Sequence, residues 1–497
     1  MRKSGILLHI TSLPTKGGIG TIGKEAYDFV DFLNKSGMSV WQILPVSPTG
    51  FGDSPYQSVS TYAGNPLLID LELLKEEGLI DSIDPMEDEE PDRVDYGRVV
   101  EHKTQVLKEA FKVSYKKCEK EVQKFIHKNA WVKDYALFSA VKEHFGMISW
   151  MSWPDEDIRM RRRDALNHYK NLLKESVNYY IFVQYLFFKQ WFALKNYANK
   201  KGVRLFGDMP IYVAEDSADV WTNPKVFQLD KNRRPTFIAG VPPDYFSMDG
   251  QRWGNPLYDW EYLKETNFRW WIKRLKAMNQ IYDILRVDHF IGFANYYSIP
   301  ADEETAKNGK WKIAPGKAFF KAVKQELPNM DIVAEDLGAV NKRVQDLLKY
   351  CGYPGMKVLS FAFSGDPHDP HLPQNYEENF VVYTGTHDNT TAEGWYQAAS
   401  EGQRALADKL LRRQPWQSFS YTMCREAMMS KADTCVLPMQ DILSLPDTAR
   451  MNIPSTIGGL NWRWRLLPGQ FNDTLADKIL SLNIMAGRAF NETKEQK

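Results

Sequence analysis

Cysteine is scarce in this chain, and long hydrophobic runs are missing. The 497 residues include four cysteines, and no two of them form a CxxC pair. So few cysteines argue against a disulfide-stapled secreted protein and favour a reducing compartment. The apolar run after Arg2 and Lys3 stops at His9, whereas a secretory signal needs about 7–15 apolar residues and a membrane span about 18. We therefore expect a cytoplasmic protein with no membrane partner.

An excess of charge of one sign is also absent. The chain has 63 Lys and Arg against 63 Asp and Glu, for a net charge of +0. Nucleic acids and anionic membranes call for a basic excess, so we expect neither as a partner. Aromatic residues make up 13% of the chain, and such rings suit either a core or a groove for a ligand with apolar faces, such as a sugar.

Motifs for metals, phosphates and a serine nucleophile are missing as well. The sequence has no HExxH, no Cys/His cluster, no Walker-type loop and no GxSxG, so we expect no metal and no cofactor. Residues Gly18–Gly23 match GxGxxG, but Ile10–Gly17 separate them from the preceding strand, and the second strand ends at Leu44–Val46 without an acid. A dinucleotide site needs both features, so these glycines are better explained by a tight turn.

Short apolar runs are what the sequence does contain, and they alternate with helical patterns. Runs of this kind suit strands buried on both faces of a parallel sheet. Amphipathic helices are predicted between them at Glu25–Leu33, Phe268–Met278 and Arg343–Lys349. Eight strand and helix pairs predict an α/β protein built on one (β/α)8 barrel over residues 1–497. The predicted strands are Ile6–His9, Val40–Pro45, Val203–Asp208, Ile284–Asp288, Ile332–Glu335, Met356–Phe361, Val381–Thr384 and Thr434–Met439.

The spacing of these strands predicts two large insertions. Residues 46–202 follow the second strand and are largely helical in pattern, and residues 209–283 follow the third. Ser36–Ile69 carries a single charge, Asp53, among aromatic residues, prolines and glycines, which suits either a cleft wall for a neutral polar ligand or a loop packed under the insertion. Only 58 residues follow Met439, so we expect no separate C-terminal β-domain.

Carboxylates follow several of the predicted strands. Asp208 ends the third strand, Asp288 the fourth and Glu335 the fifth, and Asp388 comes just after the seventh. If the barrel forms, these four groups converge on its C-terminal mouth, where barrel enzymes have their active sites. Each alone could be a helix N-cap, but a purely structural cluster of four in a low-dielectric pocket is unfavourable.

Glycosidic bond cleavage is the chemistry that needs two carboxylates and no cofactor. Arg286 and Asp288 are two residues apart on one strand, so they share a face, and the guanidinium would hold Asp288 ionised. Glu335 follows an apolar strand, where burial would raise its pKa as a general acid requires. Asp388 could bind sugar hydroxyls and favour ring distortion, with His387 as a neutral donor beside it.

At these residues the chain resembles the amylomaltases, bacterial 4-α-glucanotransferases of glycoside hydrolase family 77 in the α-amylase superfamily. The matching stretches run in order along nearly the whole chain. They are Gly5–His9 with Thr11–Pro14, Gly52–Gln57, Ala63–Pro66, Gly207–Val213, Gly240–Phe246, Gln251–Pro256, Arg286–Phe290, Ala334–Gly338, Thr386–Asn389 and Arg450–Asn452.

The resemblance implies roles for individual residues. It makes Asp288 the nucleophile, Glu335 the acid/base and Asp388 the transition-state stabiliser. It puts Tyr245 and Phe246 on a mobile aromatic loop over the cleft. The loop Pro454–Trp462 departs from the family pattern near its start, which weakens the inference for Asn461. The substrate-binding positions that the resemblance implies are Ser54, Tyr56, Asp208, Tyr245, Phe246, Gln251, Trp253, Arg286, His387 and Asn461.

The sequence thus predicts a 4-α-glucanotransferase that moves part of an α-1,4-glucan donor to the 4-hydroxyl of glucose or a maltodextrin, with retention. One alternative is an α-1,4-glucan hydrolase of the amylase type. Another is a glucan-binding or regulatory protein on a catalytically inactive barrel, against which the intact Asp288, Glu335 and Asp388 argue. Donor length, acceptor preference, cyclic products and oligomeric state stay open.

Overall fold

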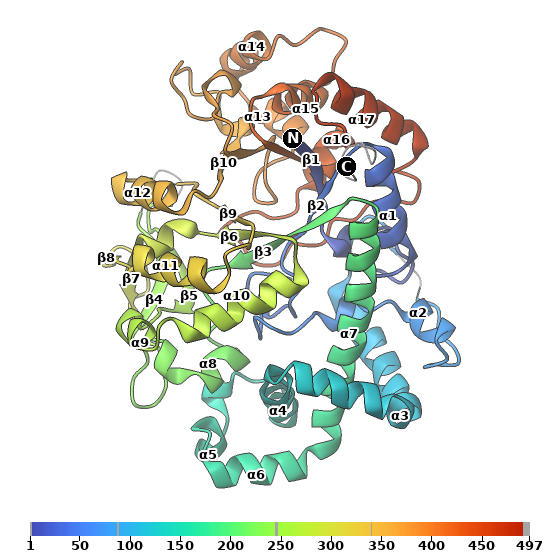
Figure 1. Cartoon of the computed structure of the whole chain (residues 1–497), viewed down its shortest axis with the longest axis vertical. Coiled ribbons are helices and arrows are strands. Elements are labelled where there is room, and N and C mark those ends of the chain that lie inside the picture. The colour runs from blue at the N-terminus through green and yellow to red at the C-terminus, as the bar shows by residue number, and fades with distance from the viewer. Residues whose placement is uncertain (1, 87–88, 244–246, 339, 491–497) are drawn as a thin grey trace.

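A parallel eight-stranded barrel forms the centre of the molecule (Figure 1). The computed structural model describes residues 2–86, 89–243, 247–338 and 340–490. The strands follow one another around the barrel as β1-β2-β3-β6-β9-β10-β11-β12, and the amide of Ala334 donates to the carbonyl of Pro354 at 2.9 Å between β9 and β10. The predicted (β/α)8 barrel is confirmed. The barrel strands are β1 (Lys3–Leu7), β2 (Val40–Gln42), β3 (Arg204–Pro210), β6 (Ile284–Asp288), β9 (Ile332–Ala334), β10 (Gly355–Val358), β11 (Phe380–Tyr383) and β12 (Thr434–Pro438).

The strand bounds differ from the prediction at one point that matters for the site. We predicted that the third strand ends at Asp208, but β3 continues to Pro210, and Asp208 pairs in register with Arg286 of β6. Asp208 therefore lies within β3 and is paired with β6 on one side, beyond the point where the pairing with β2 ends at Phe206. This position makes its side chain part of the barrel interior near the mouth.

The predicted helices also form, with small shifts at their ends. Phe268 has a left-handed backbone (φ 54°), so the helix that we predicted from Phe268 begins at Arg269. The helix that we predicted at Arg343–Lys349 runs from Lys342 to Cys351 and is capped by Asn341 at its start and by Gly352, with φ 71°, at its end. The helices are α1 (Lys24–Lys35), α2 (Leu71–Glu76), α3 (Tyr96–Lys128), α4 (Trp131–His144), α5 (Glu156–Arg159), α6 (Arg163–Leu172), α7 (Lys174–Lys200), α8 (Ala218–Thr222), α9 (Trp260–Glu265), α10 (Arg269–Ile281), α11 (Gly316–Glu326), α12 (Lys342–Cys351), α13 (Ala392–Ala398), α14 (Glu401–Leu410), α15 (Phe419–Met429), α16 (Met439–Ile442) and α17 (Asp473–Met485).

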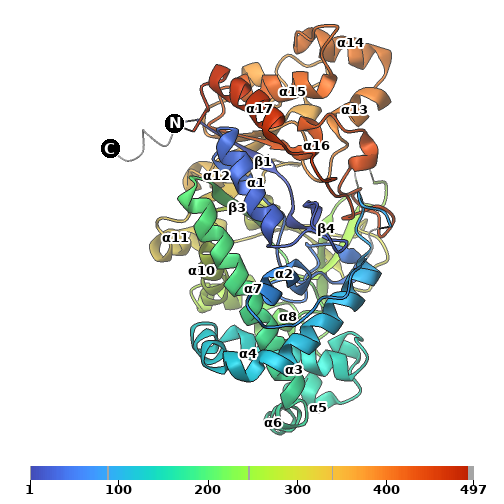
Figure 2. The ribbon, with the colours of Figure 1, turned by 90° about the vertical axis from the view of Figure 1, so that its right-hand side faces the viewer.

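Helices α2 to α7 lie between β2 and β3 along the chain. In Figures 1 and 2, α3 to α6 form the lower end of the molecule, and α13 to α17 form the upper end. Lys103 of α3 is buried, and its ammonium group donates at 2.7 Å to the carbonyls of both Leu67 and Ile69. This contact fastens the helical segment to the charge-poor stretch that precedes it.

A second sheet was not predicted. It is antiparallel, in the order β5-β4-β7-β8, and its strands are β4 (Phe237–Val241), β5 (Gln251–Pro256), β7 (Asn295–Pro300) and β8 (Lys310–Ile313). Two strands come from the second insertion, and the other two come from a further insertion after β6. Three of these strands, β5, β7 and β8, mix polar residues with apolar ones, so they lack the continuous apolar runs that reveal buried parallel strands.

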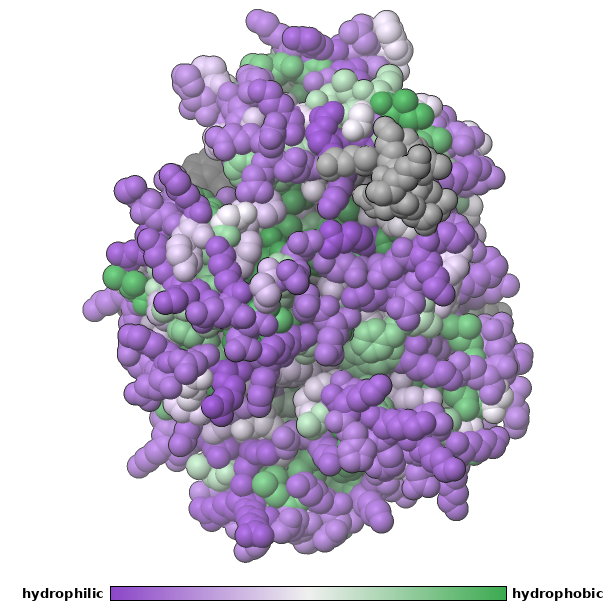
Figure 3. Space-filling view, viewed as in Figure 1, coloured by the Kyte–Doolittle hydropathy of each residue, from purple (hydrophilic) through white to green (hydrophobic). Residues whose placement is uncertain are grey.

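The described residues after β12 contain helices and loops and no strand. Arg488 is 1% exposed and donates to the carbonyls of five residues where the first and last strands begin, Lys3, Met428, Ser430, Ala432 and Asp433. No helix in the described part of the chain is long and apolar enough to cross a membrane. The face in Figure 3 is mostly hydrophilic, with apolar residues in small separate groups.

Candidate active site

Asp208, Arg286 and Asp288 form a linked row at the mouth of the barrel. One Arg286 nitrogen donates to Asp208 Oδ2 at 2.6 Å, and the other contacts Asp288 Oδ1 at 2.9 Å. Arg286 and Asp288 share a face because they are two residues apart on β6. Burial alone would lower the pKa of Arg286, but the carboxylates of Asp208 and Asp288 raise it well above its ordinary value. The guanidinium is therefore a fixed positive charge between two carboxylates.

Asp208 retains one unused acceptor. Its Oδ2 also accepts from the Tyr56 hydroxyl at 2.7 Å, while Oδ1 is buried and has no hydrogen-bond partner among the described residues. A buried carboxylate oxygen without a donor is costly unless a ligand supplies one.

Asp288 is subject to two opposing effects. Burial raises its pKa to about 6, although the neighbouring Arg286 lowers it. We predicted only the effect of Arg286, because sequence does not reveal how strongly the carboxyl is buried. Near neutral pH the group is still mostly ionised, as a nucleophile requires.

Glu335 has the opposite protonation state near neutral pH. It is 7% exposed, and burial raises its pKa to about 8, with Arg286 opposing and Asp288 adding to the shift. The direction is the one that we predicted from sequence. Its Oε2 accepts from the backbone amide of His289 at 2.6 Å, and Oε1 accepts from the amide of Leu337 at 2.9 Å. The two amides fix the carboxyl group at the mouth.

Asp388 lies on the loop after β11 and is held from the far side of the mouth. Its Oδ1 accepts from the Asn452 side-chain amide at 2.7 Å, and its backbone carbonyl accepts from Arg450 at 2.6 Å. His387 Nε2 lies 3.4 Å from the same Oδ1. The Asp388 side chain is 43% exposed, so it faces space that a ligand can reach.

Aromatic rings line this region. Tyr56 stacks on His387 with centroids 5.1 Å apart, and Trp462 lies 5.8 Å from Tyr56. On the other side, Trp253 meets the His289 ring edge-on at 4.9 Å. Such rings offer the apolar faces on which sugars pack.

The remaining predicted residues are placed as follows. Ser54 Oγ accepts from the Tyr56 amide at 3.3 Å, and Gln251 accepts from the Trp253 indole at 3.1 Å, so each supports a neighbouring aromatic residue. Asn461 is engaged within its own loop, since it accepts from the amide of Ile453 at 2.9 Å and donates to Thr456. Tyr245 and Phe246 lie outside the described residues.

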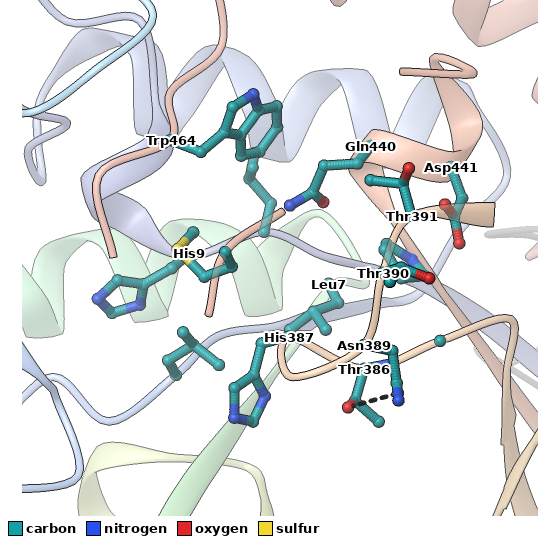
Figure 4. A pocket seen from close by; sticks show the side chains of 15 residues that line it. Leu7, His9, Thr386, His387, Asn389, Thr390, Thr391, Gln440, Asp441 and Trp464 are labelled. Carbon is teal, nitrogen blue, oxygen red and sulfur yellow. Dashed lines mark hydrogen bonds between the residues drawn. The ribbon is translucent and has the colours of Figure 1, made fainter. Parts of the chain in front are cut away.

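Sequence reasoning assigned no role to several groups that support the site. The His289 amide and the side chains of Arg450 and Asn452 belong to stretches that carried the family resemblance, but their contacts had no separate signal. His9 was another: it lines the same pocket as His387 (Figure 4), and its buried Nδ1 has no hydrogen-bond partner among the described residues. Burial and the neighbouring His387 lower the pKa of His9 to about 3, so it is neutral at ordinary pH.

No group of three His, Cys, Asp or Glu side chains among the described residues could hold a metal ion. The mouth holds Asp288 beside a guanidinium, Glu335 with a pKa raised by burial, and further polar side chains beside aromatic rings. On a (β/α)8 barrel, this combination defines an enzyme that acts on glycosidic bonds through acid/base and carboxylate chemistry.

Comparisons with known proteins give the family. The family model described as 4-alpha-glucanotransferase, of glycoside hydrolase family 77, matches residues 8–470. A 4-alpha-glucanotransferase of Clostridium butyricum is 45% identical over 97% of this chain and 100% of its own length. One of Thermus thermophilus is 46% identical over 95% of this chain and 96% of its own. The structure of an amylomaltase from Streptococcus agalactiae in complex with acarbose superposes with a TM-score of 0.96, at 43% identity over 98% of this chain and 100% of that one.

The chain belongs to the 4-alpha-glucanotransferase family, glycoside hydrolase family 77. Its activity is that of a hexosyltransferase acting on glucans, as the sequence predicted. The amylase-type hydrolase has no better support among these relatives.

Proposed function

We propose that this chain transfers a segment of an α-1,4-glucan donor to the 4-hydroxyl of glucose or a maltodextrin, with retention, through a covalent glucosyl-enzyme. The observation that carries the proposal is a pair of buried carboxyls in different surroundings: Asp288 contacts Arg286 at 2.9 Å, whereas Glu335 accepts from two backbone amides. Asp288 is mostly ionised near neutral pH and Glu335 is mostly protonated, as double displacement at a glycosidic bond requires.

In the first step, an Asp288 oxygen attacks the anomeric carbon and forms an ester. The bond to the leaving oxygen breaks, and Glu335 gives its proton to that oxygen. In the second step, the ionised Glu335 takes the proton from the acceptor 4-hydroxyl, whose oxygen attacks the same carbon and releases Asp288. The two steps restore both carboxyls to their starting protonation states.

Asp388 and Asp208 hold the sugar that reacts. Asp388, fixed by Asn452, accepts from sugar hydroxyls and stabilises the distorted ring of the transition state. The unpartnered Oδ1 of Asp208 accepts another hydroxyl. Tyr56 packs on the sugar ring, and Arg286 and His387 complete the set that binds its hydroxyls.

The acceptor competes with water for the glucosyl-enzyme. We assign Trp253 and Gln251, together with Tyr245 and Phe246, to the binding and covering of acceptor sugars, which limits the access of water to the ester. Ser54 and Asn461 support this cleft by shaping their loops. The reaction needs no cofactor and no metal in this proposal.

We also propose a cytoplasmic location. All four cysteines, Cys118, Cys351, Cys424 and Cys435, are free and buried, which fits a reducing compartment.

The test is the products formed from maltotriose. The wild-type chain should yield glucose and a ladder of longer maltodextrins, with few new reducing ends. Asp288→Asn should abolish the reaction. Glu335→Gln should nearly abolish it, yet still turn over an α-maltosyl fluoride donor, whose leaving group needs little protonation.

The activity of each variant is measured on both maltotriose and α-maltosyl fluoride. If reducing ends rise in step with maltotriose loss and no longer chains appear, transfer to sugar acceptors is wrong. If the two variants behave alike on the fluoride, the separate roles of Asp288 and Glu335 are wrong.

A further inference from the structure

The loop that carries His387 and Asp388 runs between β11 and α13. Hydrogen bonds within the loop fix the conformation of its tip, because Asn389 Oδ1 accepts from the amide of Thr386 at 2.8 Å and from the Thr386 hydroxyl at 2.9 Å. The amide of Asp388 in turn donates to the Thr386 hydroxyl at 3.3 Å. These bonds fix the shape of the tip, but they do not fix where the whole loop lies on the barrel.

A buried carboxylate outside the proposed catalytic set connects both ends of this loop to the barrel. Asp441 lies in α16, the short helix that begins directly after β12, and is 2% exposed. Its Oδ2 accepts from the hydroxyl of Thr384, where the loop begins, at 2.5 Å. Its Oδ1 accepts from the amide of Ala392, where the loop ends, at 2.7 Å. In the view of Figure 4, Thr390 lies between Asp441 and His387.

We propose that Asp441 is a positioning residue for the transfer reaction: by holding the two ends of the Thr384–Ala392 loop together, it keeps Asp388 aligned with the reacting carboxyls. Asp441 touches no sugar in this scheme, since it is buried behind the loop. The inference rests on the proposed role of Asp388 as the transition-state stabiliser. A displacement of about 1 Å in such a group can cost about 100-fold in rate. Because most of the proposed sugar contacts lie outside this loop, the effect should fall mainly on kcat.

The chain offers a matched control in Asp369. It too is a buried aspartate with one hydroxyl and one backbone amide as donors, since it accepts from Ser364 at 2.7 Å and from the amide of His371 at 2.9 Å. It lies in the segment after β10, which carries none of the proposed catalytic residues. Replacing either aspartate removes the same kinds of hydrogen bond, and only one of them holds the Asp388 loop.

The experiment measures kcat, KM and Tm for maltotriose disproportionation in the full chain. Asp441→Ala and Asp369→Ala should both lower Tm. Asp441→Ala alone should lower kcat by about 10- to 100-fold, a larger factor than any rise in KM, because the proposed sugar contacts of Asp208, Arg286 and Tyr56 lie outside the loop. Asp441→Asn should keep most of the activity, because its amide oxygen can accept from Ala392 and its NH₂ can donate to the Thr384 hydroxyl.

Equal kcat values in Asp441→Ala and Asp369→Ala would overturn the proposal, and so would a loss that appears mainly as a higher KM. If Asp441→Ala does not fold, the proposal is tested by comparing the kcat values of Thr384→Val and Asp441→Asn. Thr384→Val removes one of the two bonds and should lower kcat by about tenfold relative to Asp441→Asn, and equal values would overturn the proposal. Failure of the proposed function is recognised separately, since the wild-type chain would then form no longer maltodextrins.

Discussion

Replacement of Arg286 by methionine should move the pH profile of the enzyme upward. Arg286 is 5% exposed and binds Asp208 at 2.6 Å and Asp288 at 2.9 Å. It also lowers the pKa values of both Asp288 and Glu335, against the effect of burial. Methionine keeps much of the side-chain bulk and removes the charge, so both carboxyls should hold their protons to higher pH.

The size of the shift follows from the lost contact. A hydrogen bond to a charged group is worth about 1.5–3 kcal/mol, and one pKa unit corresponds to about 1.36 kcal/mol. The pKa of Asp288, raised by burial to about 6 in the wild type, should therefore increase by about one to two units. At pH 7 its ionised fraction would fall from about nine tenths to between about one half and one tenth. This cause alone lowers kcat/KM at pH 7 by about two- to tenfold, in addition to any loss of sugar contacts.

The assay is kcat/KM for maltotriose across the pH range, which reports the groups of the free enzyme. The wild type should give a bell with an acid limb near 6 and an alkaline limb near 8. Arg286→Met should move both limbs upward, and Arg286→Lys, which keeps the charge, should move them less. A lower rate with both limbs unmoved in Arg286→Met would refute the electrostatic role given to this residue.

Two further variants test the site from other directions. Glu335→Gln should gain stability relative to the wild type as pH rises from about 4.5 to about 8. Burial raises the pKa of Glu335 in the folded state, so the folded wild-type protein loses stability as pH rises through that range. A Tm difference between the two proteins that does not change with pH would contradict this. Asn452→Ala removes the 2.7 Å bond to Asp388 and should lower kcat by about tenfold with little change in KM; a normal kcat would show that Asp388 needs no such support.

The barrel could be predicted from the sequence because parallel strands buried on both faces are continuous apolar runs. Ile332–Ala334 is one such run, and it stands directly before Glu335. Strands β7 and β8 could not be found in this way. In Asn295–Pro300 the buried polar residues Asn295 and Ser298 interrupt the apolar run, and Lys310–Ile313 is mostly exposed. The extension of β3 beyond Asp208 depends on pairing with β6, and the sequence alone does not show this pairing.

The residue types of the candidate site could be predicted from the sequence. The pKa values of its carboxyls were harder to predict, because they depend on opposing effects of burial and nearby charge. The raised pKa of Glu335 followed from its place after an apolar strand. The raised pKa of Asp288 did not, because it depends on how much burial outweighs Arg286. The amide of His289 donates to Glu335 from a residue with φ 53°. The sequence cannot reveal backbone donors of this kind, because almost every residue type has a backbone amide. It also cannot reveal that Asp441 contacts both ends of a loop.

The central claim is that Asp288 carries the glucosyl group between donor and acceptor. The measurement that tests it most directly is the mass of the intact Glu335→Gln protein after reaction with α-maltosyl fluoride. This variant should form the ester from the activated donor and release it slowly, because no base is left to activate the acceptor. We predict a protein heavier by one glycosyl group, with the added mass on the peptide that contains Asp288. A protein that turns over the fluoride without any adduct, or with the adduct on another residue, would contradict the account.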